Sequence, residues 1–418
     1  MAKLEALAKE KGEGKPLEPR SKGYMVFLII FMGMVGLMDN FLSLVEGPAL
    51  PYILDEFGVT AQEFAFWQGI YGIITFSVFF IAWIADAYGR KKGLLVLILV
   101  MGVPALLIGF TAFTFHMFML LYALVITATL SNMWELPITE ESVPEKRGFY
   151  GGLVFLIGLI PLYAFLAVAI AESIGWRWCY GIMGFYMIIL LVLLLRMKEP
   201  QRWLDAKEQR EHRVLKIKEA LKSLKRKDYE YILISIIVYT VWTISFKIAA
   251  TWGGYYYINI IGYTPTEYSR ILMIGGLLLM LGALLSGVLL DKLGRKITLI
   301  VGCLGSVIGI TFMGITSNPI FYWMIYFFMP IVLAWIMVYF NEIFPTEVRS
   351  TAVGVTNTMV RAAYVIGPML ALLLLILFPD MGGFWVVTGL IMLIPLLSLF
   401  MKPYETKGKS LEAIQEER

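Results

Sequence analysis

Long apolar stretches alternate with short polar connections over most of this chain. Each stretch has about 20 residues, which is the length that an α-helix needs to cross the hydrocarbon core of a bilayer. Gly and Pro recur inside the stretches, as is common in membrane helices. The pattern predicts twelve transmembrane helices, at 24–46, 64–85, 94–115, 117–137, 150–171, 178–195, 230–256, 271–290, 298–317, 319–340, 351–377 and 383–401.

The composition agrees with a membrane protein. Of the 418 residues, 59% are hydrophobic and 16% are charged, and a soluble domain could not bury so much apolar surface. With both termini placed inside, all of the 35 Lys and Arg residues except Arg177, Lys247, Arg270 and Arg361 fall at cytoplasmic positions. This asymmetry predicts a multi-pass protein of the cell membrane with both termini in the cytoplasm. The net charge of +4 therefore requires no nucleic-acid partner.

One sequence block occurs twice, about 205 positions apart, and each copy lies between two apolar runs. A second pair of blocks keeps nearly the same offset. The residues that recur are Asp86, Gly89, Arg90, Glu141 and Arg147 in the first half, and Asp291, Gly294, Arg295, Glu342 and Arg349 in the second. An internal repeat of this length indicates two related halves that can move against each other around a central site.

The repeat predicts an all-α membrane protein whose twelve transmembrane helices form two pseudo-symmetric six-helix bundles. We expect an N-terminal bundle with its tail at 1–195, a cytoplasmic linker at 196–228, and a C-terminal bundle with its tail at 229–418. The two Cys and two His residues are isolated along the chain, so no disulfide framework, metal site or cofactor is expected. The pattern also disfavours an enzyme.

These blocks resemble those of the major facilitator superfamily, and within it the sugar-porter and metabolite:proton symporter families. The superfamily block between helices 2 and 3 begins with a Gly, which is present as Gly287 in the second copy and replaced by Ala82 in the first. The resemblance covers nearly the whole chain, and it implies a secondary transporter that works by alternating access. The other segments similar to family signatures are 36–39, 200–204, 342–349 and 403–411.

The repeated charged residues suggest a gate. Acidic residues at the inner ends of helices can pair with nearby bases and with a helix N-terminus. Alternating access needs two nearly balanced states, and breakable ion pairs supply the bias between them. We interpret the following residues as a cytoplasmic gate, with loop charges that only fix orientation as the alternative: Asp86, Gly89, Arg90, Glu141, Arg147, Asp291, Gly294, Arg295, Glu342 and Arg349.

Three charged residues fall inside predicted helices: Asp39, Lys247 and Arg361. A charge at such depth is costly and usually faces a cavity or a partner. Asp39 is the candidate for reversible protonation during transport, and a structural Asp39–Lys247 pair is the alternative. In the proton symporters that the chain resembles, such an acid pairs with an Arg of helix 4. The stretch 117–134 contains no base, so Lys247 or Arg361 would replace that Arg.

Lys247 and Arg361 also indicate the substrate, because two cations facing a cavity would bind a carboxylate or phosphate. Sugar porters carry Gln-Gln where this chain has Phe246-Lys247, which favours an organic anion over a sugar. Aromatic side chains could enclose the substrate body, with packing as the alternative. The aromatic candidates are Tyr239, Trp242, Trp252, Tyr256, Trp335 and Tyr364.

The first hypothesis is therefore a proton-coupled symporter for a small organic anion. Three alternatives stay open: a sugar or polyol transporter, an exporter of hydrophobic or cationic compounds, and a nutrient sensor. The expected partners are a small-molecule substrate, a proton and the lipid bilayer, and the expected working unit is a monomer.

Overall fold

The computed structural model describes residues 20–129, 131, 133–142, 144–201, 203–204, 226–344, 346–401 and 403–407. Twelve helical stretches within these ranges are long and apolar enough to cross a membrane, and each coincides with one predicted run. The twelve predicted spans and the all-α fold class are thus confirmed. Most of the predicted linker at 196–228 lies outside the described residues.

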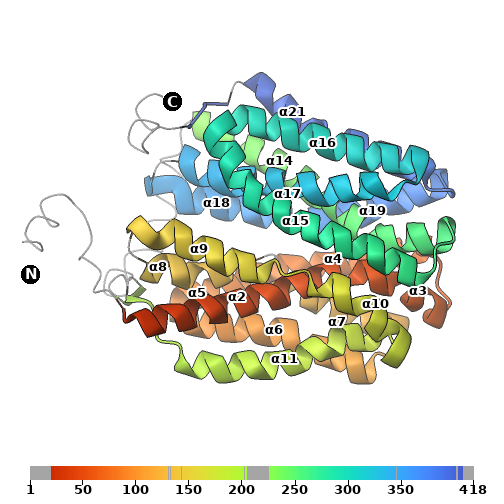
Figure 1. Cartoon of the computed structure of the whole chain (residues 1–418). Coiled ribbons are helices and arrows are strands. Elements are labelled where there is room, and N and C mark those ends of the chain that lie inside the picture. The colour runs from red at the N-terminus through yellow and green to blue at the C-terminus, as the bar shows by residue number, and fades with distance from the viewer. Residues whose placement is uncertain are drawn as a thin grey trace, which may run out of the picture.

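The chain forms two bundles of helices that lie side by side (Figure 1). The first bundle contains α2 (Lys22–Leu44), α3 (Glu46–Phe57), α4 (Ala61–Gly72), α5 (Val78–Tyr88), α6 (Arg90–Thr111), α7 (Phe115–Ala128), α8 (Leu136–Glu141), α9 (Pro144–Gly158), α10 (Leu162–Ile174) and α11 (Arg177–Arg196). The second contains α14 (Arg226–Tyr255), α15 (Pro265–Leu293), α16 (Arg295–Thr316), α17 (Pro319–Ile343), α18 (Thr346–Val360), α19 (Ala363–Leu377), α20 (Gly382–Ile391) and α21 (Ile394–Leu397).

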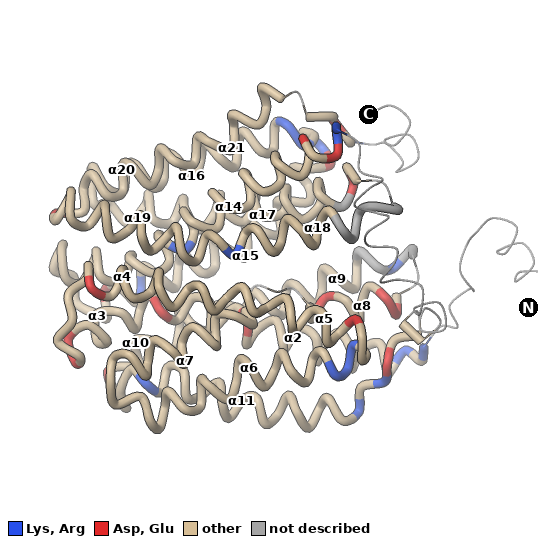
Figure 2. The backbone as a smooth tube through the Cα atoms, turned by 180° about the vertical axis from the view of Figure 1, so that it is seen from behind, with Lys and Arg blue, Asp and Glu red and all other residues tan. Residues whose placement is uncertain are grey.

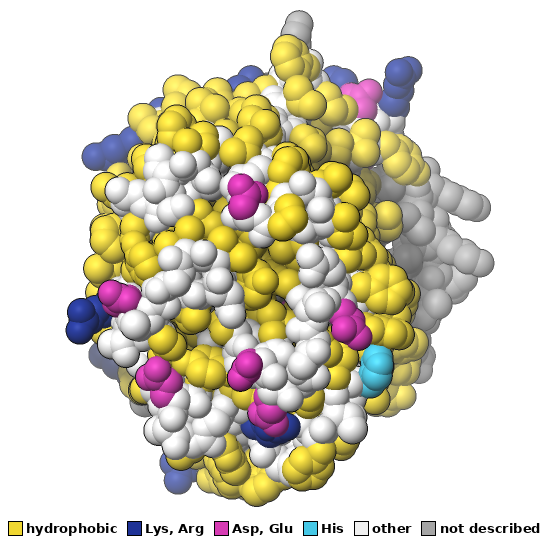
Figure 3. Space-filling view, turned by 90° about the vertical axis from the view of Figure 1, so that its right-hand side faces the viewer, with side chains coloured by type: hydrophobic (Ala, Val, Ile, Leu, Met, Phe, Trp, Pro, Cys, Tyr) yellow, Lys and Arg dark blue, Asp and Glu magenta, His cyan; other side chains and the backbone are white. Residues whose placement is uncertain are grey.

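Both bundles present their charged residues mainly at one end. We call the end at which α2 and α18 begin the terminal face, and the opposite end, beside α3 and α20, the distal face (Figures 1 and 2). The Lys, Arg, Asp and Glu positions gather toward the terminal face (Figure 2). On the distal face, acidic side chains are scattered between apolar ones, and most of the visible basic side chains lie near the rim (Figure 3).

Several membrane-spanning stretches are interrupted near their middle. The first span breaks at Val45, close to the end of the predicted run at 24–46, and the chain continues as α3 to Phe57. A 3₁₀ segment, Ile73–Ser77, separates α4 from α5, and a second, Met133–Glu135, precedes α8. The eleventh span turns between Val360 and Ala363. Interrupted helices leave backbone polar groups without helical partners, and in transporters they commonly line the binding site.

The two bundles pack closely against each other in their distal halves. The packed pairs are α3 with α14, α4 with α19, and α10 with α15. Gly is required at two of these contacts, because a Cβ on Gly47 would lie 2.0 Å from the carbonyl oxygen of Ala250, and one on Gly72 would lie 2.1 Å from that of Tyr364. In the terminal half of the second span, by contrast, α5 buries only Ile81 and Ala85. The molecule is therefore closed at its distal face.

Candidate functional site

A cavity lies between the two bundles and is lined by both of them. Its walls come from α4, Ile73–Ser77 and α7 on one side, and from α14 and α19 on the other. Its volume is about 30 Å³, which is room for about two water molecules, whereas small-molecule sites enclose roughly 300–1,000 Å³. The cavity in this structure is therefore smaller than a typical small-molecule site. The polar and aromatic residues that line it include Gln68, Tyr122, Lys247, Thr251, Trp252 and Tyr364.

Lys247 lies on this cavity and forms an ion pair across the bundle interface. Its Nζ lies 3.5 Å from Oε2 of Glu46 and donates a hydrogen bond of 2.9 Å to the carbonyl oxygen of Ser43. The Lys247 side chain is 13% exposed and that of Glu46 is 1% exposed. The ammonium group therefore points into the protein, where it is partly neutralised by a carboxylate of the opposite bundle.

Glu46 is the first residue of α3, and sequence reasoning did not select it. Its Oε2 accepts a hydrogen bond of 2.8 Å from Oγ1 of Thr251, and its Oε1 accepts one from Nε2 of Gln68. A carboxylate at a helix N-terminus also interacts favourably with the helix dipole. The sequence did contain a signal, since Glu46 is an acid at the end of an apolar stretch. Because Gly47 and Pro48 follow it directly, the pattern indicated the end of a helix instead.

Asp39 is buried in α2, with 3% of its surface exposed. Its Oδ2 accepts a hydrogen bond of 2.9 Å from Nε1 of Trp134, and its Oδ1 accepts one of 3.4 Å from Oγ of Ser43. Trp134 belongs to the fourth span, so that span supplies Asp39 with an indole donor. Because Asp39, Ser43 and Glu46 are spaced by four and three residues, they share one side of the span, and they form a polar row that leads to Lys247.

Arg361 lies at the interruption of the eleventh span and reaches the fourth. Its two terminal nitrogens each donate to the carbonyl oxygen of Thr129 at 3.3 Å. Thr129 follows the last residue of α7, where the backbone carbonyl has lost its helical partner. The guanidinium carbon lies 5.5 Å from the ring centroid of Tyr364, a cation–π distance. Arg361 thus lies behind Tyr364, which itself lines the cavity.

The aromatic candidates divide into two groups. Trp252 and Tyr364 line the cavity. The other four do not line it: the Trp242 indole donates to the carbonyl of Met329 at 2.8 Å, and Trp335 stacks on Tyr339 at 4.6 Å. In this closed form the structure brings two of the six to the cavity. The four elsewhere are Tyr239, Trp242, Tyr256 and Trp335.

At the terminal face, the predicted gate residues form an ion-pair network in each bundle. In the first bundle, Arg90 donates to Asp86 at 2.5 Å and to Glu140 at 2.7 Å. The carboxylate of Glu199 accepts the backbone N–H of Lys91 at the start of α6. Gly89 has a φ of 123°, a conformation that favours glycine, so the predicted glycine turn is present.

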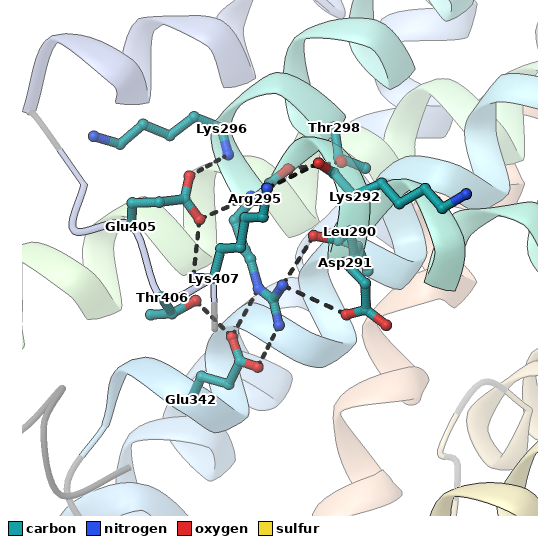
Figure 4. A network of polar contacts seen from close by, with 11 residues as sticks. Leu290, Asp291, Lys292, Arg295, Lys296, Thr298, Glu342, Glu405, Thr406 and Lys407 are labelled. Carbon is teal, nitrogen blue, oxygen red and sulfur yellow. Dashed lines mark hydrogen bonds and ion pairs between the residues drawn. The ribbon is translucent and has the colours of Figure 1, made fainter. Parts of the chain in front are cut away.

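The second bundle repeats this arrangement (Figure 4). Arg295 lies 2.6 Å from Glu342 and 3.8 Å from Asp291, and Gly294 has a φ of 87°. Glu405 accepts the backbone N–H groups of Arg295 and Lys296 at 2.9 Å and 3.0 Å.

Glu405 shows how this network affects a carboxyl group outside the spans. Its partial burial alone would raise its pKa. The backbone N–H groups of Arg295, Lys296 and Lys407, together with the charge of Arg295, outweigh that effect and lower the pKa of Glu405 below its usual value. The network therefore favours the ionised carboxylate at the N-terminus of α16.

The structure changes one pairing in the predicted repeat. Glu140, rather than Glu141, occupies the position that corresponds to Glu342, because Glu140 is the partner of Arg90. Glu141 instead accepts two hydrogen bonds from Arg20, at 2.9 Å and 3.0 Å. The side chains of the two remaining predicted gate residues lie outside the described part of the structure; these are Arg147 and Arg349.

The described part of the chain thus has twelve helices that are long enough to span a membrane, arranged in two bundles with a cavity lined by both, which is the architecture of a secondary transporter. The chain matches the sequence model of the Major Facilitator Superfamily over residues 26–368, and it belongs to this family. It is a membrane transporter of the major facilitator type, and its family and fold are not those of an enzyme.

Known relatives extend this assignment. The chain is 26% identical to the galactose-proton symporter of Escherichia coli, covering 95% of each chain. It is 25% identical to the alpha-ketoglutarate permease of Escherichia coli, covering 78% of this chain and 80% of the relative. The crystal structure of the D-xylose-proton symporter superimposes with a TM-score of 0.74 at 18% identity, covering 93% of this chain and 100% of that chain. At this identity, the structural likeness supports the fold alone.

Proposed function

We propose that this transporter is a proton-coupled symporter for a small organic anion. The observation that carries the proposal is the ammonium group of Lys247 on an inter-bundle cavity. The guanidinium of Arg361 adds a second cation behind the ring of Tyr364. When the cavity enlarges, a carboxylate that enters it meets Lys247 first, and a shift of Tyr364 exposes Arg361. The relationship to a permease named for a dicarboxylate agrees with this substrate class.

Asp39 is the proposed carrier of the coupling proton. It is buried, and its hydrogen bond to Ser43 connects it to the residue whose backbone carbonyl binds Lys247. A change in the charge of Asp39 can therefore affect Lys247 through Ser43, which contacts both residues. Burial makes such a carboxyl group sensitive to its surroundings, which is what coupling requires.

The terminal face is proposed to lie in the cytoplasm. Charged residues gather there (Figure 2), and basic residues near span ends favour the cytoplasmic side. The networks around Arg90 and Arg295 would then act as the cytoplasmic gate, clamping the helix ends within each bundle. Because ion pairs of this kind are breakable, they can bias the balance between the open and closed forms.

A sugar is the alternative substrate. The alignment with the galactose-proton symporter covers 95% of each chain. Gln68 and Thr251 provide neutral polar groups at the cavity. Recognition of a sugar, however, requires many neutral donors and acceptors, and Lys247 occupies a central position on this cavity. The charged residue favours an anion.

Uptake into proteoliposomes tests the proposal. The purified protein is reconstituted, an inward proton gradient is imposed, and the accumulation of radiolabelled 2-oxoglutarate, other small carboxylates and galactose is compared. We expect accumulation of a carboxylate. Asp39→Asn should abolish accumulation driven by the pH gradient but preserve exchange of substrate across the membrane.

The variants Lys247→Gln and Arg361→Gln separate the two substrate classes. Each should reduce carboxylate transport by at least about tenfold, since each removes a charged contact. Galactose accumulation that persists unchanged in Lys247→Gln, together with no carboxylate accumulation by the native chain, would establish the sugar alternative.

A further inference from the structure

Glu46 connects the two bundles at the level of the cavity. It begins α3 in the first bundle, and it contacts Lys247 and Thr251, which both belong to α14 in the second. It also accepts a hydrogen bond from Gln68 of α4. Directly beside it, the backbone of Gly47 packs against that of Ala250. The carboxylate is therefore part of the contact that closes the distal face.

The charge of Glu46 matters to this contact because the pair is almost completely buried. The two side chains are 1% and 13% exposed, and a buried charge that loses its counter-charge is strongly destabilising. When a proton binds Glu46, the attraction to Lys247 disappears while Lys247 keeps its charge. Lys247 then favours a form in which its ammonium group gains more water, or another anion, than the small cavity holds. Separation of the bundles at this level provides such a form.

The other groups around Glu46 do not provide a second cation among the described residues. The phenols of Tyr122 in α7, Tyr180 in α11 and Tyr364 in α19 lie close enough to interact with it. Asp39 lies further along the same span, beyond Ser43. In α10, which also packs on α3, the carboxylate of Glu172 lies close enough to Tyr52 to interact with it. Lys247 is thus the cationic partner of Glu46 in this cluster.

We propose that Glu46 is a second proton-binding residue of the transport cycle and an internal competitor of the substrate. In its ionised form it occupies Lys247 and holds the distal face closed. After it takes up a proton from the distal side, Lys247 is available for the carboxylate of the substrate, and the distal face opens. The substrate part of this inference rests on the proposed anion transport, whereas the effect of Glu46 on distal opening does not.

The distance between the distal ends of the two bundles tests the inference without any substrate. Spin labels are attached at Ser173→Cys on α10 and Thr266→Cys on α15, both exposed distal positions on helices that pack together. The native cysteines, Cys179 and Cys303, are buried and are replaced by Ala. Double electron–electron resonance of the reconstituted full chain then gives the ratio of open to closed molecules from neutral to acidic pH.

In the otherwise native chain, the open fraction should rise as the pH falls. Glu46→Gln should raise the ratio of open to closed molecules at neutral pH by about tenfold or more and remove its pH dependence, because the carboxylate that pairs with Lys247 is gone. Glu172→Gln, the same change at an exposed distal carboxylate, should behave like the native chain. A native-like distance distribution and pH response in Glu46→Gln would overturn the inference.

The double variant Glu46→Gln/Lys247→Gln protects the test against misfolding, because it leaves no unpaired charge in the cluster. Its ratio of open to closed molecules should no longer depend on pH, and a native pH response in this variant would also overturn the inference. If the distance changes follow these expectations while Lys247→Gln leaves carboxylate uptake intact, the proposed role of Lys247 in substrate binding is wrong and the gating role of Glu46 stands. If Lys247→Gln abolishes uptake and the distances ignore Glu46, only this inference fails.

Discussion

The guanidinium group of Arg361 donates two hydrogen bonds to the backbone carbonyl of Thr129, each 3.3 Å long. Both residues lie where a membrane-spanning helix is interrupted, and the two helices belong to opposite bundles. An Arg in this place has two roles: it supplies the hydrogen bonds that the broken helix lacks, and it keeps a positive charge close to the cavity. These roles can be separated by substitution.

Arg361→Lys keeps the positive charge but loses the planar group that donates to Thr129 and stacks on Tyr364. We expect the rate of carboxylate transport to fall by about tenfold or more, because the geometry rather than the charge is lost. Uptake and exchange in proteoliposomes measure the effect. Arg270→Lys, at an exposed position in α15, is the matched control. A native transport rate in Arg361→Lys would show that only the charge matters.

The close backbone contacts in the distal halves give a second prediction. A Cβ on Gly47 would lie 2.0 Å from the carbonyl oxygen of Ala250, and a backbone atom cannot move aside as a side-chain end can. Gly47→Ala should therefore prevent full distal closure and reduce substrate exchange by at least about tenfold, since the closed state is destabilised. The spin-label distances described above should shift toward the open form.

Gly151→Ala is the control for this substitution, because nothing lies within 4 Å of the added Cβ. Both variants remove a helical glycine, so any general effect on helix stability is shared. If Gly47→Ala retained the closed distance and normal exchange, the distal packing would have to be looser than the structure shows.

The ion-pair network of the second bundle gives a third prediction. Arg295 is 8% exposed and Glu342 is 22% exposed in their side chains, so either residue alone would remain as a poorly solvated charge. Arg295→Gln and Glu342→Gln should each destabilise the protein by about 1–3 kcal/mol, and the double variant by no more than either single one.

Thermal unfolding in detergent measures this coupling. Lys292→Gln, a neighbouring exposed base, should leave the unfolding temperature unchanged. Strictly additive losses in the double variant would show that Arg295 and Glu342 contribute independently of each other.

The length of the apolar stretches predicted the twelve spans because each span must match the thickness of the bilayer, which constrains length and composition together. It also located Asp39, Lys247 and Arg361, because a charge inside an apolar run is conspicuous. No charged residue in the sequence indicated the interruption of the fourth span at Thr129. A broken helix in a membrane is stabilised by distant groups, here a guanidinium 232 positions away in the sequence, and local sequence does not report those groups.

The carboxylates of the site were harder to predict for the same reason. Glu46 stands before Gly47 and Pro48, a local pattern that indicates the end of a helix, yet here Glu46 and Pro48 occupy the first turn of α3, where Pro is tolerated. Glu140 was missed because the offset between the repeats is not constant along the chain. The adjacent acids Glu140 and Glu141 then differ only in the direction in which their side chains point. That direction depends on the packed structure.

The lowered pKa of Glu405 gives the last prediction. Because its folded-state pKa is below that of an unfolded chain, about 4.3, its ionised form stabilises the start of α16 above this pH. This contribution is lost as the pH falls through the folded-state pKa. The amides of Arg295 and Lys296, which donate to Glu405, should therefore lose protection from hydrogen exchange below about pH 4, after correction for the intrinsic rate. Glu405→Gln should weaken their protection at neutral pH and flatten its dependence on acid, whereas Glu230→Gln, at an exposed position, should change neither. Protection that is equally pH-dependent in Glu405→Gln would assign the acid response to another carboxyl group of the network.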